Sequence, residues 1–252
     1  MTDTTAPVGP TPPTGPLPYA YDVTGSGPVL LVMPGGAGHP MGLEPLTEWL
    51  AADFTVVTYD PLGLAHGRLG RPVPEQLVAR WSDGAHRVLE TVLPKGESAY
   101  VFGTSSGGVA ALDLLARHPG RLAHVVAHEP PCVTLLPDGP ERRAELIGQL
   151  DGPKRPPAQG ESATPMGVFL AHVLRPFTAH VPAFTAPSGR LTVAVGTDSR
   201  GQLLHRTGRF LAERLGGALT EFPGGHLGAL DHPAEFADLL ATTLGSSTGL
   251  SV

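Results

Sequence analysis

The chain has 252 residues, 41% of them apolar, which is enough for one large domain with a substantial core. Charged residues are scarce at 16%, and 17 Lys and Arg against 23 Asp and Glu give a net charge of −6. Phosphate contacts need clustered cations, so we expect no nucleic-acid binding. No apolar run reaches the roughly 18 residues that span a bilayer, and the first residues do not resemble a signal peptide. We therefore expect no membrane association and a cytoplasmic location, and the single cysteine excludes an internal disulfide framework.

The first 18 residues differ in composition from the rest of the chain. They hold six prolines and almost no large apolar side chain. Such a segment buries too little apolar surface to offset the entropy lost on ordering. We expect residues 1–18 to form a flexible tail outside the folded domain.

Short apolar runs alternate with longer amphipathic segments in the rest of the chain. The candidate strands are residues 29–33, 55–59, 100–102, 124–128, 191–195 and 218–222. Most are apolar throughout, as expected when helices cover both faces of a sheet. The candidate helices between them are a segment that begins at Pro74 and residues 106–118, 202–215 and 233–244. This alternation predicts an α/β fold with a mostly parallel sheet.

One interval of about sixty residues interrupts the alternation. Residues 132–190 contain no good strand but two helical segments, residues 140–150 and 165–177. The second follows Thr164, a candidate N-cap, and places apolar side chains at helical spacing: Met166, Phe169, Leu170, Val173 and Phe177. Long insertions in compact domains often act as lids. We predict a helical lid at residues 132–190 on a core of residues 19–131 and 191–252, with Met166, Phe169, Val173 and Phe177 as substrate contacts. The alternative is that this stripe packs only on neighbouring helices as core.

The sharpest motif is residues 103–107, Gly-Thr-Ser-Ser-Gly, which fits G-x-S-x-G. A buried candidate strand runs directly into it and an apolar-faced helix runs out of it. In such a strand–turn–helix the middle residue, Ser105, is strained and projects above the sheet, and the flanking glycines permit the close packing this requires. The helix N-terminus behind it favours developing negative charge. We interpret Ser105 as a nucleophile and the amide of Ser106 as a donor to an oxyanion.

With this motif in this order of elements, the chain resembles the α/β-hydrolase family from Tyr19 to Leu244. Within that family it is similar to the small capped esterases, perhydrolases and iminopeptidases. The resemblance implies the α/β-hydrolase fold, a mostly parallel sheet with helices on both faces and a short helical lid. The serine at the elbow disfavours the relatives that use an aspartate nucleophile.

A serine hydroxyl needs a base within hydrogen-bond reach, and that base needs an orienting group. Of the eleven histidines, only His226 lies in a glycine-rich loop between the last candidate strand and the last helix, where this family places its base. Asp198 follows the strand at residues 191–195, where the family usually places its acid. Glu129 follows the strand at residues 124–128, where some members carry it instead. We favour Asp198 as the acid and keep Glu129 as the alternative.

Residues 34–38, Pro-Gly-Gly-Ala-Gly, resemble the family's oxyanion loop, which implies that Gly36 donates its amide. Pro34 stands where relatives often have histidine, which leaves the Gly36 amide intact. His39 follows this loop and is a candidate substrate contact. No His, Asp or Glu cluster has metal-ligand spacing, and the glycine-rich loops lack a nucleotide-binding frame, so we expect neither metal nor cofactor.

These observations predict a serine hydrolase acting on small to medium apolar acyl esters, thioesters or lactones through an acyl-serine. The expected partner is a small-molecule substrate, and the sequence gives no indication of oligomeric state. Two alternatives remain: a non-hydrolytic lyase or cyclase of specialised metabolism on the same fold, and a ligand-binding protein with an idle triad.

Overall fold

The structure is a computed structural model that describes residues 19–151, 162–183 and 189–246. Its centre is a seven-stranded sheet in the order β1-β3-β2-β4-β5-β6-β7. The strands are β1 (Ala20–Thr24), β2 (Val29–Met33), β3 (Thr55–Asp60), β4 (Ala99–Thr104), β5 (Leu122–His128), β6 (Leu191–Gly196) and β7 (Ala218–Phe222). Only β1 runs antiparallel to its neighbour, β3, and all other pairs are parallel. The predicted α/β fold with a mostly parallel sheet is confirmed.

All six candidate strands are present, and β1 is the one that sequence reasoning did not place. It pairs on one side only, at the sheet edge, and its residues are partly or fully exposed. An edge strand of this kind lacks the continuous apolar run by which the central strands are found.

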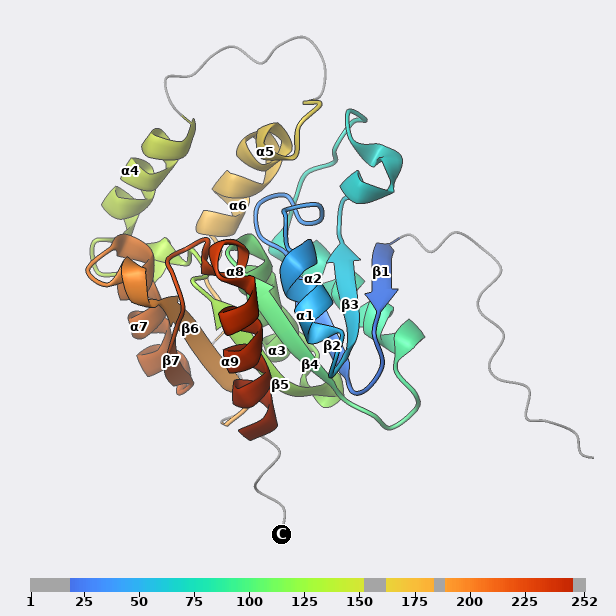
Figure 1. Cartoon of the computed structure of the whole chain (residues 1–252). Helices are drawn as coiled ribbons and strands as arrows, with labels where there is room; N and C mark the ends of the chain where they lie inside the picture. Colours follow the sequence, from blue (N-terminus) through green and yellow to red (C-terminus); the bar gives the residue numbers. More distant parts are fainter. Residues whose placement is uncertain (1–18, 152–161, 184–188, 247–252) are drawn as a thin grey trace, which may run out of the picture.

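Helices cover both faces of the sheet (Figure 1). One face packs against α2 (Val78–Val92), α3 (Ser106–Arg117) and α7 (Leu203–Leu215), and the other against α1 (Glu44–Leu50) and α9 (Pro233–Ser246). The helix expected from Pro74 begins four residues later, at Val78, after an extended Leu77.

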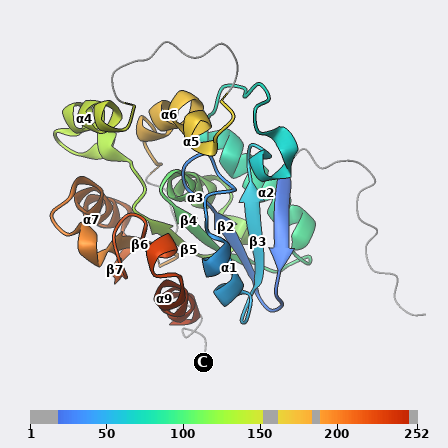
Figure 2. The same ribbon diagram turned by 45° about the horizontal axis from the view of Figure 1, so that its top comes forward.

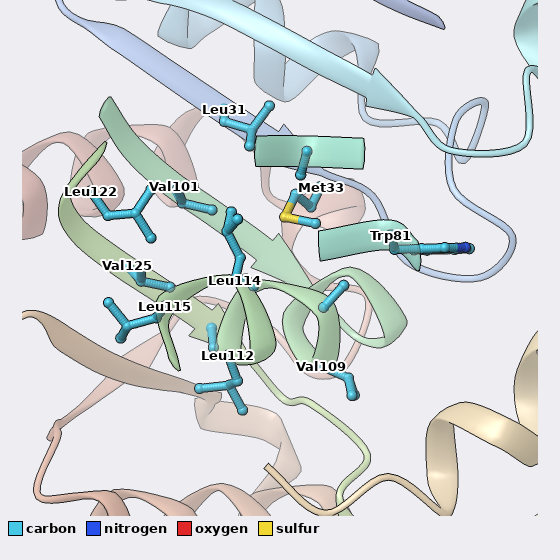
Figure 3. Packing of buried hydrophobic residues seen from close by; sticks show 14 of the residues in the cluster. Leu31, Met33, Trp81, Val101, Val109, Leu112, Leu114, Leu115, Leu122 and Val125 are labelled. Carbon is cyan, nitrogen blue, oxygen red and sulfur yellow. The ribbon is translucent and has the colours of Figure 1, made fainter. Parts of the chain in front are cut away.

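The two faces have separate apolar clusters because side chains alternate along each strand. In β2, Leu31 and Met33 join the first cluster, while Leu30 and Val32 join the second. Figure 3 shows the first cluster, in which the side chains of β2, β4 and β5 lie against α3 with Trp81 of α2 nearby. The sheet is thus buried on both sides and is a rigid base for the loops at its carboxyl edge.

The remaining helices lie mainly beyond the carboxyl ends of the strands. They are α4 (Gly139–Asp151), α5 (Pro165–Val168), α6 (Leu174–Thr178) and α8 (Gly228–Asp231). The described residues also form single helical turns: η1 (Leu64–Arg68), η2 (Pro119–Arg121), η3 (Val133–Leu135), η4 (Phe169–Val173) and η5 (Thr197–Ser199). Figure 2 shows α4, α5 and α6 together above the sheet. Within the described ranges, no helix is both long and apolar enough to cross a membrane.

The helix predicted at residues 165–177 is three consecutive pieces, α5, the π-helical turn η4 and α6. Thr164 caps it as predicted, since its Oγ1 accepts a hydrogen bond from the Gly167 amide at 3.1 Å. The predicted tail at residues 1–18 lies outside the described residues, as do residues 152–161 and 184–188 of the predicted lid and residues 247–252 of the core.

Candidate active site

Ser105 lies at the turn between β4 and α3 with φ 52° and ψ −122°, a conformation that is unusual for a residue with a side chain. Its own amide is anchored by a 2.9 Å hydrogen bond to the carbonyl oxygen of His128 on β5. The flanking glycines are required by packing. A Cβ on Gly103 would lie 2.5 Å from the Gly107 carbonyl oxygen, and one on Gly107 would overlap the carbonyl oxygen of Met33. The strained elbow predicted from the motif is therefore present in the fold.

Ser105, His226 and Glu129 form a hydrogen-bonded chain. Nε2 of His226 lies 3.2 Å from Oγ of Ser105, and its Nδ1 lies 3.0 Å from Oε2 of Glu129. With the proton on Nδ1, the imidazole donates to Glu129 and accepts from the serine hydroxyl. His226 is partly exposed, whereas Glu129 is completely buried. This arrangement can move a proton from Ser105 to His226 and stabilise the imidazolium that results.

This geometry contradicts the prediction that Asp198 is the acid beside His226. Asp198 follows β6, as predicted, but its side chain is exposed, and its Oδ1 accepts a 3.4 Å hydrogen bond from the Thr197 hydroxyl. Its main-chain amide instead donates to the carbonyl oxygen of Gly224 at 2.9 Å and so holds the loop that contains His226. Glu129 follows β5, the direct neighbour of β4, and its φ of 41° turns the chain sharply at the strand end. Glu129, the alternative, is thus the carboxylate beside His226.

Several groups hold Glu129 in its ionised form. Burial by itself would raise the pKa of this carboxyl, but hydrogen bonds from His226, the Gly196 amide and Ser199 outweigh burial and lower its pKa to about 2. The Gly196 amide donates to Oε1 at 2.9 Å, which leaves Oε2 for His226. A negative charge beside His226 is therefore maintained at neutral pH.

His128 lies behind the imidazole of His226 and is fully buried. The two rings are stacked with centroids 6.4 Å apart, and Nδ1 of His128 lies 3.1 Å from the Thr104 hydroxyl. Burial lowers the pKa of His128 to about 4. Its ring is therefore neutral near pH 7 and adds no positive charge that would oppose protonation of His226.

Gly36 and Ser106, the two residues predicted to donate their amides to an oxyanion, lie next to Ser105 at the same cavity. Gly36 has a φ of +57°, and a Cβ at the preceding Gly35 would lie 3.0 Å from Cβ of Ser105. The glycine loop thus packs directly on the nucleophile, and α3 begins at Ser106 with its amides directed toward this region.

The cavity above Ser105 has a volume of about 460 Å³ and is mainly apolar. Of the four predicted contacts from residues 165–177, Met166, Phe169 and Phe177 line it. Val173 does not: it is fully buried in the first core cluster. Sequence reasoning missed further apolar lining residues, among them Met41, Leu146, Leu174, Leu204, Leu227 and Leu230. Met41 and Leu227 could have been suggested by their nearness in sequence to Gly36 and His226, whereas the others come from segments without a motif.

His39 is not among the residues that line this cavity. Its Nε2 lies 3.1 Å from Oδ2 of Asp22 on β1, and Asp22 also lies 3.4 Å from His66. The position of His39 therefore does not support its predicted role as a substrate contact. Among the residues that the structure describes, no three His, Cys, Asp or Glu side chains are grouped so that they could hold a metal ion.

Comparison with known proteins identifies the family. No protein-family model matches the chain. It is 32% identical over 245 residues to YraK of Bacillus subtilis strain 168, described as an uncharacterized hydrolase, with 87% of this chain and 90% of that protein covered. Among solved structures, a thermophilic esterase from Thermogutta terrifontis has a TM-score of 0.63 at 17% identity, covering 91% of this chain and 93% of that one. The enol-lactonase from Burkholderia xenovorans LB400 has a TM-score of 0.56 at 18% identity, covering 90% and 100%.

The structural neighbours share the overall fold of this chain, and their low identity limits them to evidence of fold. The Bacillus relative matches nearly the whole length of both chains. This chain belongs to the α/β-hydrolase family and is a hydrolytic enzyme.

Proposed function

We propose that this hydrolase cleaves small to medium apolar acyl esters, or the related thioesters and lactones, through an acyl-serine intermediate. The observation that supports this most is the Ser105–His226–Glu129 chain at the floor of an apolar cavity. The names of two structural neighbours, an esterase and an enol-lactonase, fit the same chemistry.

In the proposed mechanism, Oγ of Ser105 attacks the substrate carbonyl carbon while Nε2 of His226 takes the serine proton. Glu129 accepts the Nδ1–H of His226 and stabilises the imidazolium. The amides of Gly36 and Ser106 donate to the oxyanion of the tetrahedral intermediate. His226 then gives its proton to the leaving oxygen, and an acyl-serine remains. Water, deprotonated by His226, attacks the acyl carbon. The bond from that carbon to Oγ of Ser105 then breaks, His226 returns the proton to Oγ, and the carboxylic acid is released.

The cavity suggests the class of acyl group. Apart from His226, no titratable side chain is among the described residues that line it, so a charged acyl group would lose its hydration without a partner. A volume of about 460 Å³ suits a small or medium acyl group rather than a long lipid.

An active-site-directed fluorophosphonate probe tests the proposal. The folded protein should be labelled at Ser105, as located by peptide mass spectrometry, and should hydrolyse p-nitrophenyl butyrate. Ser105→Ala should lose both labelling and hydrolysis with an unchanged melting temperature. A folded wild-type protein that is neither labelled nor active would contradict the proposal and favour a lyase, a cyclase or a binding protein on this fold.

A further inference from the structure

The side chain of Ser106 makes a contact that the mechanism above does not use. Ser106 is the first residue of α3 and is 1% exposed. Its hydroxyl donates a 2.6 Å hydrogen bond to the carbonyl oxygen of Gly36, a residue 70 positions earlier in the chain. The bond joins the helix behind the nucleophile to the glycine loop at residues 34–38.

That loop has few other directional restraints among the contacts described. Gly36 and Gly38 have φ angles of +57° and +89°, and the Gly38 amide closes a turn on the Gly35 carbonyl oxygen at 2.9 Å. Glycine populates several backbone conformations at similar cost, so these angles do not hold the loop in one conformation by themselves. Gly35 packs against Ser105, but a packing contact does not fix the direction of a peptide group.

We infer that the Ser106 side chain is a positioning residue that holds Gly36 in the orientation needed to donate to the oxyanion. This inference rests on the proposed function. Ser106 then acts on both sides of the oxyanion hole, because its backbone amide is one donor and its hydroxyl holds the residue that presents the other. The bond is buried, so water does not compete for the Gly36 carbonyl oxygen.

Such a role predicts a specific kinetic signature. Oxyanion donors act on the tetrahedral transition state more than on the bound ester. Loosening Gly36 should therefore lower kcat and leave KM nearly unchanged. Losing one buried hydrogen bond and part of the alignment of one donor should lower kcat by about 5- to 50-fold.

The test compares Ser106→Ala with Ser106→Thr, which keeps the hydroxyl, in the full-length protein. Thr207→Val is the matched control, because Thr207 is equally buried but its hydroxyl bonds within α7, to the Leu203 carbonyl oxygen. We would measure kcat and KM for p-nitrophenyl butyrate, the inhibition constant of butylboronic acid, whose serine adduct is tetrahedral, and the melting temperature of each variant.

We expect Ser106→Ala to lower kcat by about 5- to 50-fold, with KM within about twofold and boronate binding weakened by a factor similar to that for kcat. Ser106→Thr should recover most of the rate, and Thr207→Val should change the melting temperature alone. If Ser106→Ala does not fold, Ser106→Cys, whose thiol is a poor donor, should show the same pattern.

Three results would overturn the inference: a kcat for Ser106→Ala within twofold of wild type, an effect confined to KM, or equal losses in the Ala and Thr variants. These results require an active wild-type enzyme. An inactive, unlabelled wild type would instead contradict the proposed function, and this inference with it, so the two failures are distinguishable.

Discussion

At the scale of single residues, backbone strain in the described part of the chain coincides with the candidate site. Two residues other than glycine have positive φ angles there, Ser105 at 52° and Glu129 at 41°. Such conformations cost about 1–3 kcal/mol each and persist only where the surroundings hold them. They follow the neighbouring strands β4 and β5, and the resulting turns bring the hydroxyl and the carboxylate to the two nitrogens of His226.

The first prediction separates the two carboxylates. Glu129→Gln should lower kcat by about 10²- to 10⁴-fold, because a carboxamide stabilises the imidazolium poorly and can select the wrong tautomer of His226. Asp198→Asn should change kcat by less than about threefold, because its side chain is exposed and bonds to Thr197. Steady-state rates on p-nitrophenyl butyrate measure both. A larger loss of kcat in Asp198→Asn than in Glu129→Gln would identify Asp198 as the acid.

At the scale of elements, the segment from α5 to α6 both lines the cavity and packs in the core. From the sequence, these were two alternatives: its apolar side chains contact substrate, or they pack only on neighbouring helices. Phe169 and Phe177 line the cavity, while Val173 between them is fully buried against the first core cluster. Phe177 also packs on Trp81 of α2, with ring centroids 4.6 Å apart. The segment is anchored to α4 by Arg143, which donates to the Thr178 hydroxyl at 3.1 Å and to the Arg175 carbonyl oxygen at 2.7 Å.

The second prediction concerns Phe169. For p-nitrophenyl acetate, butyrate and hexanoate, kcat/KM should rise by up to about fourfold per methylene, from about 0.8 kcal/mol of burial, until the cavity is full. Phe169→Ala should reduce this dependence, since it removes part of the apolar wall. An ester with an acidic acyl group should be a poor substrate for both proteins.

Leu219→Ala is the matched control for Phe169→Ala, because Leu219 is an exposed apolar residue of β7 outside the cavity lining. It should leave the chain-length dependence unchanged. Equal rates for all esters in wild type and Phe169→Ala would show that the segment from α5 to α6 does not form the acyl site.

At the scale of the whole molecule, the second core cluster connects the back of the sheet to the site. The ring of Phe236 on α9 lies 5.5 Å from Phe102, 4.7 Å from Phe222 and 5.2 Å from His128, measured between ring centroids. Helix α9, none of whose described residues line the cavity, thus supports the histidine whose ring is stacked with that of His226.

The third prediction is that Phe236→Ala lowers the free energy of unfolding by about 3–5 kcal/mol, because it removes a fully buried aromatic side chain from a packed cluster. Trp49→Ala, at a side chain 57% exposed on α1, should change it by less than about 0.5 kcal/mol. Urea denaturation followed by circular dichroism measures both. Similar midpoints for the two variants would mean that this cluster does not determine global stability.

The fourth prediction links stability to pH. The pKa of Glu129 is about 2 in the folded protein, against an ordinary value of 4.5. A lowered pKa means that ionisation stabilises the folded state fully above about pH 4.5 and that this contribution is lost as the pH falls toward 2. Between about pH 5 and pH 2.5, the free energy of unfolding should therefore fall less steeply in Glu129→Gln than in wild type. Parallel curves for wild type and Glu129→Gln would contradict the prediction.

Much of the fold could be predicted from sequence because its signals are local. The buried central strands are continuous apolar runs, and the elbow at Ser105 needs glycines at fixed positions around it. The positions of Ser105, Gly36, Ser106 and His226 around one cavity follow from the order of the parallel strands and the loops at their carboxyl ends. These features by themselves determined the α/β fold and most of the candidate site.

The choice between the two carboxylates was decided only by tertiary structure. Glu129 and Asp198 each follow a buried strand, and no local pattern distinguishes them. What separates them is the strained turn at Glu129, its burial, and its nearness to β4, which carries Ser105. In the same way, only packing could show that Val173 joins the core and that His39 pairs with Asp22, because both outcomes depend on neighbours far away in sequence.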